Sequence, residues 1–270
     1  DYSYDRAGNL TAFQSGAQRT ELLRDALGLP ADFTGTIHDS ATTATFSAVT
    51  TMRENALGFQ GIGEGLSGAP TLPIYASAQT HSSVGKAVRL SGIGQNNLVK
   101  VAGKPDDPRY SMDPAALDAA IRADLEAGHK PAGVVLATGG TAIGACDDIA
   151  ACIDVARAHD LPTHVDAAWA GSAMICPEFR DLWAGVKKAD SVVFNPHKWL
   201  GEQFDCSIQI LRDPGAQEYA ANQAREEARH VSGFSIYVAK RWGTPLPCGS
   251  GLGGLLDEAV QAPMVYKKLV

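Results

Sequence analysis

Between residues 70 and 200, short apolar segments alternate with segments whose apolar side chains recur at helical spacing. The apolar segments are 73–77, 97–102, 133–138, 163–167 and 191–194, and most are rich in β-branched residues. Alternation of this kind indicates a mostly parallel β-sheet covered by helices on both faces. The predicted fold class is therefore α/β. In open sheets of this class, ligand sites form beyond the carboxyl ends of the strands.

Composition and charge exclude several classes of function. The chain has 270 residues, of which 45% are hydrophobic, so it can bury a sizeable core in one large or two small domains. The formal net charge of −7 argues against a nucleic-acid or anionic-membrane partner. We find neither an apolar run long enough to span a membrane nor a secretory signal. The cysteines are widely spaced, which favours reduced cytoplasmic thiols over a disulfide framework or a metal site.

The segment 191–207 holds the first candidate for chemistry. Its apolar start is broken by Asn195 and Pro196, and Lys198 follows between His197 and Trp199. Burial would push this lysine toward the neutral, nucleophilic form that Schiff-base chemistry needs. Taken alone, however, the residues favour a lysine whose stem packs on an indole while its amine stays in water.

Three further features have both a functional and a simpler interpretation. Asp39 or Ser40 can cap a helix that runs to about Asn55, and the free amides of its first turn could hold a phosphate. His81 lies where a strand gives way to a helix and could stack on an aromatic ring, although a lone histidine is more often structural. Asp166 lies near a strand end, where a carboxylate can simply form a turn hydrogen bond.

Two longer motifs favour the functional interpretation of these residues over the simpler one. Asn-Pro-His-Lys-Trp at 195–199, with Phe-Asp-Cys-Ser at 204–207, resembles the cofactor-lysine segment of the group II pyridoxal-phosphate amino-acid decarboxylases, and most of all their aromatic-L-amino-acid branch. His-Val-Asp-Ala-Ala-Trp-Ala-Gly-Ser at 164–172, with Cys-Pro-Glu-Phe-Arg at 176–180, matches the same family at the expected spacing.

This resemblance implies a domain organisation. Residues 1–212 are expected to form the core of a large domain of PLP fold type I, the aspartate-aminotransferase-like fold. Residues 213–270 match poorly and are predicted to be loop, helix or a disordered tail. Because family members are longer at both ends, we expect the chain to be a truncated core.

The resemblance also implies a cofactor and a role for each site residue. Pyridoxal 5'-phosphate (PLP) would bond to Lys198, Asp166 would keep its ring nitrogen protonated, and His81 would stack on the ring. These three form the predicted catalytic set. His164 is expected to support the site from behind. The predicted cofactor-binding set is Ser40, Ala41 and Thr42 for the phosphate, Ala168 against the ring, and also His81, Thr141, Asp166, Asn195, His197 and Lys198.

The implied activity is decarboxylation of an aromatic L-amino acid, of tyrosine, DOPA, tryptophan or phenylalanine type, to amine and CO2 by a homodimer. Family decarboxylases carry a mobile-loop tyrosine whose place falls near 226–228, and no tyrosine occurs there. An aromatic acetaldehyde synthase and a non-catalytic remnant therefore remain alternatives. A Gly-x-Gly-x-x-Gly pattern at Gly249, Gly251 and Gly254 leaves an NAD-linked enzyme as a weak fourth hypothesis.

Overall fold

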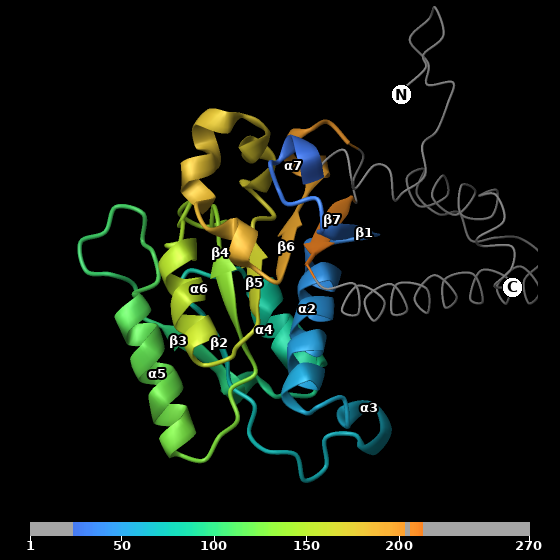
Figure 1. The fold of residues 1–270 in the computed structure, drawn as a ribbon, viewed down its shortest axis with the longest axis vertical. Helices are drawn as coiled ribbons and strands as arrows, with labels where there is room; N and C mark the ends of the chain where they lie inside the picture. Colours follow the sequence, from blue (N-terminus) through green and yellow to red (C-terminus); the bar gives the residue numbers. More distant parts are fainter. Residues whose placement is uncertain (1–23, 203–205, 213–270) are drawn as a thin grey trace, which may run out of the picture. The chain divides into compact units, whose positions relative to one another are not determined.

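The computed structural model of this chain describes residues 24–202 and 206–212. These residues form one seven-stranded sheet in the order β1-β7-β6-β5-β4-β2-β3 (Figure 1). The predicted segment 213–270 lies outside the described residues. The strands are β1 Thr34–His38, β2 Ile74–Ser77, β3 Leu98–Val101, β4 Gly133–Ala137, β5 Thr163–Asp166, β6 Ser191–Phe194 and β7 Ser207–Leu211.

The sheet is mostly parallel, as predicted. β3, β2, β4, β5 and β6 pair in parallel, whereas β7 pairs antiparallel with both β6 and β1. The antiparallel step fits the connection between β6 and β7, because a parallel crossover takes at least about a dozen residues and usually contains a full helix. Only residues 195–206 separate β6 from β7, and they include the single turn α7. Since β1 is reversed relative to β7, it runs in the same direction as the parallel strands.

Helices cover both faces of this sheet, with α5 and α6 on one side and α2 and α4 on the other (Figure 1). The α-helices are α2 Ala41–Ala56, α3 Gly61–Glu64, α4 Ser82–Leu90, α5 Pro114–Glu126, α6 Ile149–Ala158 and α7 Pro196–Trp199. The 3-10 helices are η1 Gln95–Asn97, η2 Gly171–Ile175, η3 Pro177–Trp183 and η4 Val186–Lys188.

Local sequence signals account for where the helices begin. Ser40 caps α2 by accepting a hydrogen bond from the Thr43 amide, as predicted. Asp113 caps α5 in the same way and is followed by a proline at the first helical position. The glycine-rich stretch 58–69, whose composition is typical of a loop, contains the short helix α3.

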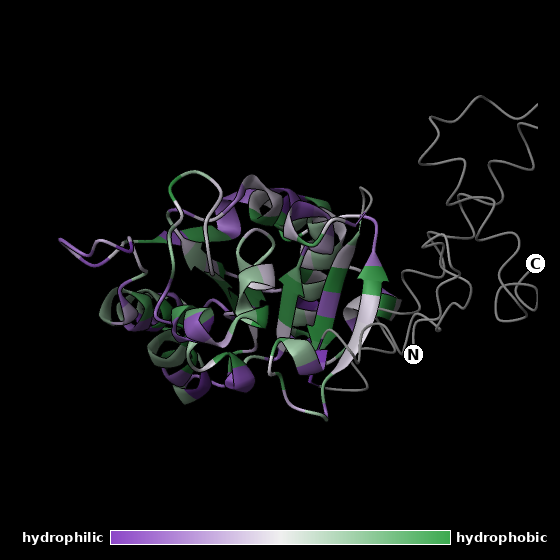
Figure 2. Ribbon diagram, turned by 90° about the horizontal axis from the view of Figure 1, so that it is seen from above, coloured by the Kyte–Doolittle hydropathy of each residue, from purple (hydrophilic) through white to green (hydrophobic). Residues whose placement is uncertain are grey.

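Alternate residues of each central strand contribute to two separate apolar cores. Val134 and Leu136 pack with α5 and α6, whereas Val135 between them packs with α2 and α4. This period of two is the geometry of a strand covered on both faces. Figure 2 shows the result, with apolar strands in the interior and hydrophilic residues on the outer surfaces of the helices.

Asp147 ties the end of β4 to a neighbouring loop. Its Oδ1 accepts a hydrogen bond from the Met112 amide and its Oδ2 accepts one from the Ala137 amide, both at 2.7 Å. The side chain is buried, and burial raises the pKa of Asp147 to about 6, although the two amides act in the opposite direction. Ala137 is the last residue of β4, so this carboxylate helps to hold the carboxyl edge of the sheet.

This pKa leads to a prediction for stability. Because it is raised from 3.8 to about 6, the folded state holds the proton more tightly than the unfolded chain. The resulting stabilisation is complete below about pH 4 and is lost as the pH rises through about 6. At about 1.4 kcal/mol per pKa unit, the free energy of unfolding should fall by about 3 kcal/mol over this window, relative to Asp147→Asn. Urea unfolding across the pH range measures this, and parallel curves for the two proteins would contradict it.

No helix among the described residues has both the length and the apolar character that crossing a membrane requires.

Candidate active site

A cavity of about 280 Å³ opens at the carboxyl edge of the sheet. Residues that follow β1, β2, β4, β5 and β6 line it, because these strands all point toward the same edge. All ten residues of the predicted cofactor-binding set are among them: Ser40, Ala41, Thr42, His81, Thr141, Asp166, Ala168, Asn195, His197 and Lys198. Sequence reasoning missed the other four, which are Ala137, Gly139, Gly140 and Trp169.

The amino end of α2 forms one wall of the cavity. Amides in the first turn of a helix have no acceptor within the helix. Ser40 Oγ takes the Thr43 amide at 3.2 Å, so the Ala41 and Thr42 amides are the ones left for a ligand. The dipole of this 16-residue helix adds a partial positive charge at the same point. This wall is thus suited to an anion such as a phosphate.

Asp166, the last residue of β5, lies on the cavity floor and is only 8% exposed. Burial raises the pKa of its carboxyl group, while a hydrogen bond from the Ala168 amide and the charges of His81 and Lys198 lower it. Among the described residues it accepts one hydrogen bond, at Oδ1 from Ala168, over 3.1 Å. A buried carboxylate with so little support would gain from a cationic partner in the cavity.

Lys198 lies at the cavity mouth, in the single turn of α7. Lys198 is exposed, so the structure does not show the burial that would favour a neutral, nucleophilic amine. The reason is that α7 sits at the outer end of β6 and no described residue closes over it. Lys198 is nevertheless near enough to Asp166 for its charge to lower the pKa of that acid.

Two indoles join the loops beside this lysine. Trp169 follows β5 and Trp199 follows Lys198, and their rings meet edge to face with centroids 5.1 Å apart. Both rings remain partly exposed, at 43% and 48%. Behind them Gly139 lies so close that a Cβ atom on it would be 3.0 Å from the Trp169 ring and 2.3 Å from Ala170 Cβ. The loops after β4, β5 and β6 are therefore packed against one another.

Hydrogen bonds orient the remaining polar residues. Ser207 Oγ donates to Asn195 Oδ1 at 2.7 Å, so the amide nitrogen of Asn195 is left as a donor for the cavity. The Cys206 amide donates to Nδ1 of His197 at 3.0 Å, which ties α7 to the start of β7. One contact involves the first residue of β7, and the other involves the residue before it. Sequence reasoning did not predict this strand.

His164, predicted to support the site from behind, does not line the cavity and lies two residues before Asp166 on the same face of β5. It is fully buried, and burial lowers its pKa to about 3, so the ring is neutral. Its Nδ1 lies 2.7 Å from Ser191 Oγ on the neighbouring strand, and its Nε2 has no hydrogen-bond partner among the described residues. Two other buried polar residues, His38 and Gln209, lie on neighbouring strands of this sheet half.

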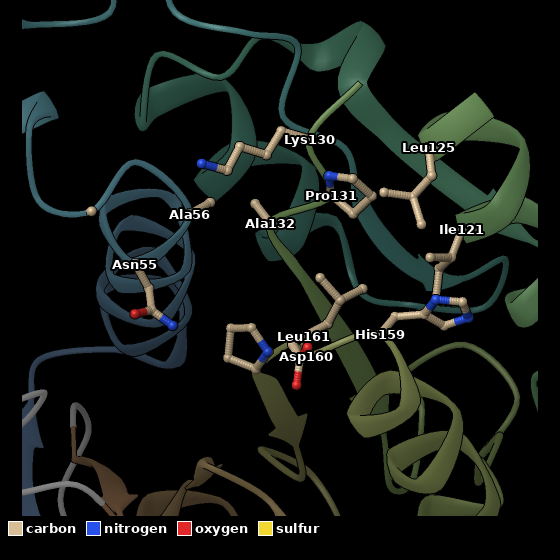
Figure 3. A pocket seen from close by; sticks show the side chains of 12 residues that line it. Asn55, Ala56, Ile121, Leu125, Lys130, Pro131, Ala132, His159, Asp160 and Leu161 are labelled. Carbon is tan, nitrogen blue, oxygen red and sulfur yellow. The ribbon is translucent and has the colours of Figure 1, made fainter. Parts of the chain in front are cut away.

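A second cavity, of about 410 Å³, lies at the opposite edge of the sheet (Figure 3). Its lining includes Lys130, which precedes β4, Leu161, which precedes β5, and Asn55 from the last turn of α2. It is the larger cavity, but none of the predicted site residues lines it. Because open parallel sheets bind ligands at their carboxyl edge, we assign the active site to the smaller cavity.

A comparison with protein families decides what this site belongs to. The family model described as "Pyridoxal-dependent decarboxylase conserved domain" matches residues 18–227, which is most of the chain. This chain belongs to the pyridoxal-dependent decarboxylase family. The match confirms the resemblance of the two motifs, and it extends beyond residue 212, where the well-matched core was expected to end.

Known relatives agree with this assignment. Tryptophan decarboxylase 1 of Oryza sativa subsp. japonica is 40% identical over 219 residues, which are 77% of this chain and 42% of that protein. Phenylacetaldehyde synthase of Arabidopsis thaliana is 34% identical over 214 residues, or 78% of this chain and 43% of that protein. The crystal structure of Oryza sativa TDC with PLP and tryptamine matches with a TM-score of 0.69 at 36% identity, over 74% of this chain and 42% of that one. This chain thus spans less than half the length of these relatives.

The cavity of this family member fits PLP, the cofactor of the family. The α2 amides suit the phosphate, and a lysine at the mouth suits the aldehyde. The decisive observation is Asp166, whose buried carboxylate forms no ion pair with the described residues and accepts a hydrogen bond only from the Ala168 amide among them, so a protonated pyridine nitrogen would supply the direct cationic contact that it lacks. Ala168, beside it, is small enough to leave room for a flat ring.

The close packing at Gly139 leads to a prediction with a matched control. Gly139 and Gly144 both have positive φ, +75° and +72°, but a Cβ atom on Gly144 would meet nothing within 4 Å. Gly139→Ala therefore adds overpacking against Trp169 and Ala170 to a backbone strain that Gly144→Ala shares. We expect the PLP dissociation constant to rise at least about tenfold for Gly139→Ala and by less than about threefold for Gly144→Ala. Equal losses in an absorbance titration would show that backbone strain alone is responsible.

Proposed function

We propose that this protein is a PLP-dependent decarboxylase that converts an aromatic L-amino acid to its amine and CO2. The observation that carries the proposal is the gathering of Lys198, Asp166 and the amino end of α2 around one cavity. The names of the relatives, tryptophan decarboxylase among them, support the aromatic substrate class.

Five residues that line the cavity have distinct roles in this proposal. The Ala41 and Thr42 amides bind the phosphate, and Ser40 holds the turn that presents them. Asp166 keeps a proton on the ring nitrogen, because an opposite charge favours the protonated form. Lys198 provides the amine that anchors the cofactor and is released when substrate binds. When bound, PLP supplies an electron sink for the pair left at Cα as CO2 departs.

An aromatic acetaldehyde synthase is the second candidate. Its support is the similarity to the Arabidopsis phenylacetaldehyde synthase, together with the absence of tyrosine at 226–228 in the sequence. Those positions, and the glycine pattern at 249–254, lie outside the described residues. The two activities share the cofactor and the lysine, so only their products separate them.

We also propose that the active protein is a cytoplasmic homodimer. Lys198 and Trp169 line the cavity and are exposed in the single chain, as is Trp199 beside Trp169, and a second subunit would exclude water from them. Cys146, Cys152 and Cys176 are free thiols, which suits a reducing compartment. Light scattering of the PLP-loaded protein tests the dimer, and a monomer at micromolar concentration would contradict it.

One experiment tests the activity and separates the alternatives. The protein is incubated with PLP and a panel of aromatic and acidic L-amino acids, and CO2, amine, aldehyde, ammonia and peroxide are measured together. Equal amounts of CO2 and amine from an aromatic substrate support the decarboxylase. Aldehyde with ammonia and peroxide supports the synthase. No turnover of any substrate, with PLP bound, supports a non-catalytic remnant.

A further inference from the structure

His81 combines two structural roles, because it lines the active-site cavity and is also the N-cap of α4. Its Nδ1 accepts a hydrogen bond from the Ser83 amide at 3.2 Å, and Ser83 Oγ lies 2.9 Å from the same nitrogen. N-caps are usually serine, threonine, aspartate or asparagine. Here the capping acceptor is a ring nitrogen, so the cap also affects the chemistry of the imidazole.

The direction of the capping bond determines where the imidazole proton lies. A backbone amide can only donate, so the Nδ1 atom that receives it presents a lone pair and carries no proton. In the neutral ring the proton is then on Nε2. A second proton on Nδ1 would require the capping bond to break. A neutral ring can donate a hydrogen bond from Nε2, but releasing that proton would leave an anionic imidazole.

We propose that Ser83 is a positioning residue that fixes the tautomer and orientation of His81 and so presents Nε2–H to the cavity as a hydrogen-bond donor. Ser83 is buried at the foot of α4, with 1% of its surface exposed, whereas its neighbour Ser82 is exposed. While the cap stands, His81 orients and hydrogen-bonds a ligand, and a proton delivered to the product comes from another group. Only this catalytic consequence rests on the proposed function.

The tautomer can be measured without cofactor or turnover. Nitrogen-15 NMR of histidine-labelled protein, at a pH where the imidazole is neutral, shows which ring nitrogen carries the proton. The chain has seven histidines, and the His81 signals are identified by their loss in His81→Asn. We expect Nε2–H in the wild type and in Ser82→Ala. Ser83→Ala keeps the backbone amide but loses the hydroxyl contact with Nδ1, so less holds Nδ1 unprotonated and a measurable Nδ1–H fraction should appear. A protonated Nδ1 in the wild type, or identical spectra for the two serine variants, would overturn the proposal.

Kinetics of the PLP-loaded protein test the consequence. A lost hydrogen bond to a positioned group corresponds to roughly three- to tenfold in rate, so kcat should fall by about that factor in Ser83→Ala, with KM within about twofold. Ser82→Ala should leave both constants unchanged. Equal kcat values for the two variants would remove the positioning role. If the wild type neither binds PLP nor turns over, the proposed function fails, whereas the NMR result still stands by itself.

Discussion

Lys198→Ala is expected to abolish the absorbance band of lysine-bound PLP and to lower turnover by at least about 10³-fold, in the range that groups in direct contact with reacting atoms contribute. The physical reason is that no other amine lines the cavity among the described residues. Alanine removes the nucleophile while leaving the fold intact, because Lys198 is exposed and its side chain makes no hydrogen bond to the described residues. The measurements are an absorbance spectrum with added PLP and the rate of CO2 release.

Lys130→Ala is the matched control for this experiment. Lys130 is also exposed, but it lines the larger cavity at the opposite edge of the sheet (Figure 3). We expect its replacement to leave both the band and the turnover unchanged. Loss of the band in Lys130→Ala but not in Lys198→Ala would indicate that the cofactor binds in the larger cavity. An unchanged spectrum in Lys198→Ala would by itself refute the assignment of the active site.

Asp166→Asn is expected to change activity and stability in opposite directions. Asparagine has nearly the same shape and can still accept the Ala168 amide, but it cannot keep a pyridine nitrogen protonated. We expect kcat to fall by about 10²–10⁴-fold with PLP still bound. A fall of less than about tenfold in steady-state kinetics would show that the ring nitrogen does not depend on this acid.

The stability effect follows from burial. Because burial raises the pKa of Asp166, its contribution to stability is present at low pH and is lost as the pH rises through the folded-state value. At neutral pH this contribution is smaller than at low pH, and the uncharged amide of Asp166→Asn does not depend on pH in this way, so Asp166→Asn should unfold at higher urea concentration than the wild type. Equal or lower stability would contradict this. Asp190→Asn is the control, because Asp190 accepts hydrogen bonds from Thr163 at the other end of β5. It should lose stability while its kcat changes little.

Much of the fold could be predicted because its signals are local. Runs such as 133–138 and 163–167 are apolar over the length of a strand, and Ser40 and Asp113 mark helix starts with their side chains. Strand β7 was missed because it pairs antiparallel with β6 and so does not belong to the alternation of parallel strands and helices on which the prediction rested. Helix α3 was missed because its sequence, Gly-Ile-Gly-Glu, has low helix propensity.

The residues of the candidate site also divide into those that the sequence predicted and those that it did not. Lys198 and Asp166 lie in long motifs whose order along the chain identifies the family, so the sequence alone is enough to name both. Trp169 lies in the same motif as Asp166, and Gly139 follows a predicted strand, but neither was assigned to the site. An indole and a glycine become part of a site only when loops from different strands pack together. The exposure of Lys198 also depends on what covers the end of β6, which is a property of the folded chain.

The sequence alone was thus enough to predict the α/β class, the family, and Lys198 and Asp166 as the two residues that would contact opposite parts of a cofactor. Only the tertiary structure showed that ten residues spread from 40 to 198 line one cavity, that Ser207 hydrogen-bonds Asn195, and that the Ser83 amide donates to Nδ1 of His81. The physical reason is that apolar periodicity and capping depend on neighbours along the chain. Hydrogen-bond direction and burial depend instead on neighbours in space, which the pairing of the strands brings together.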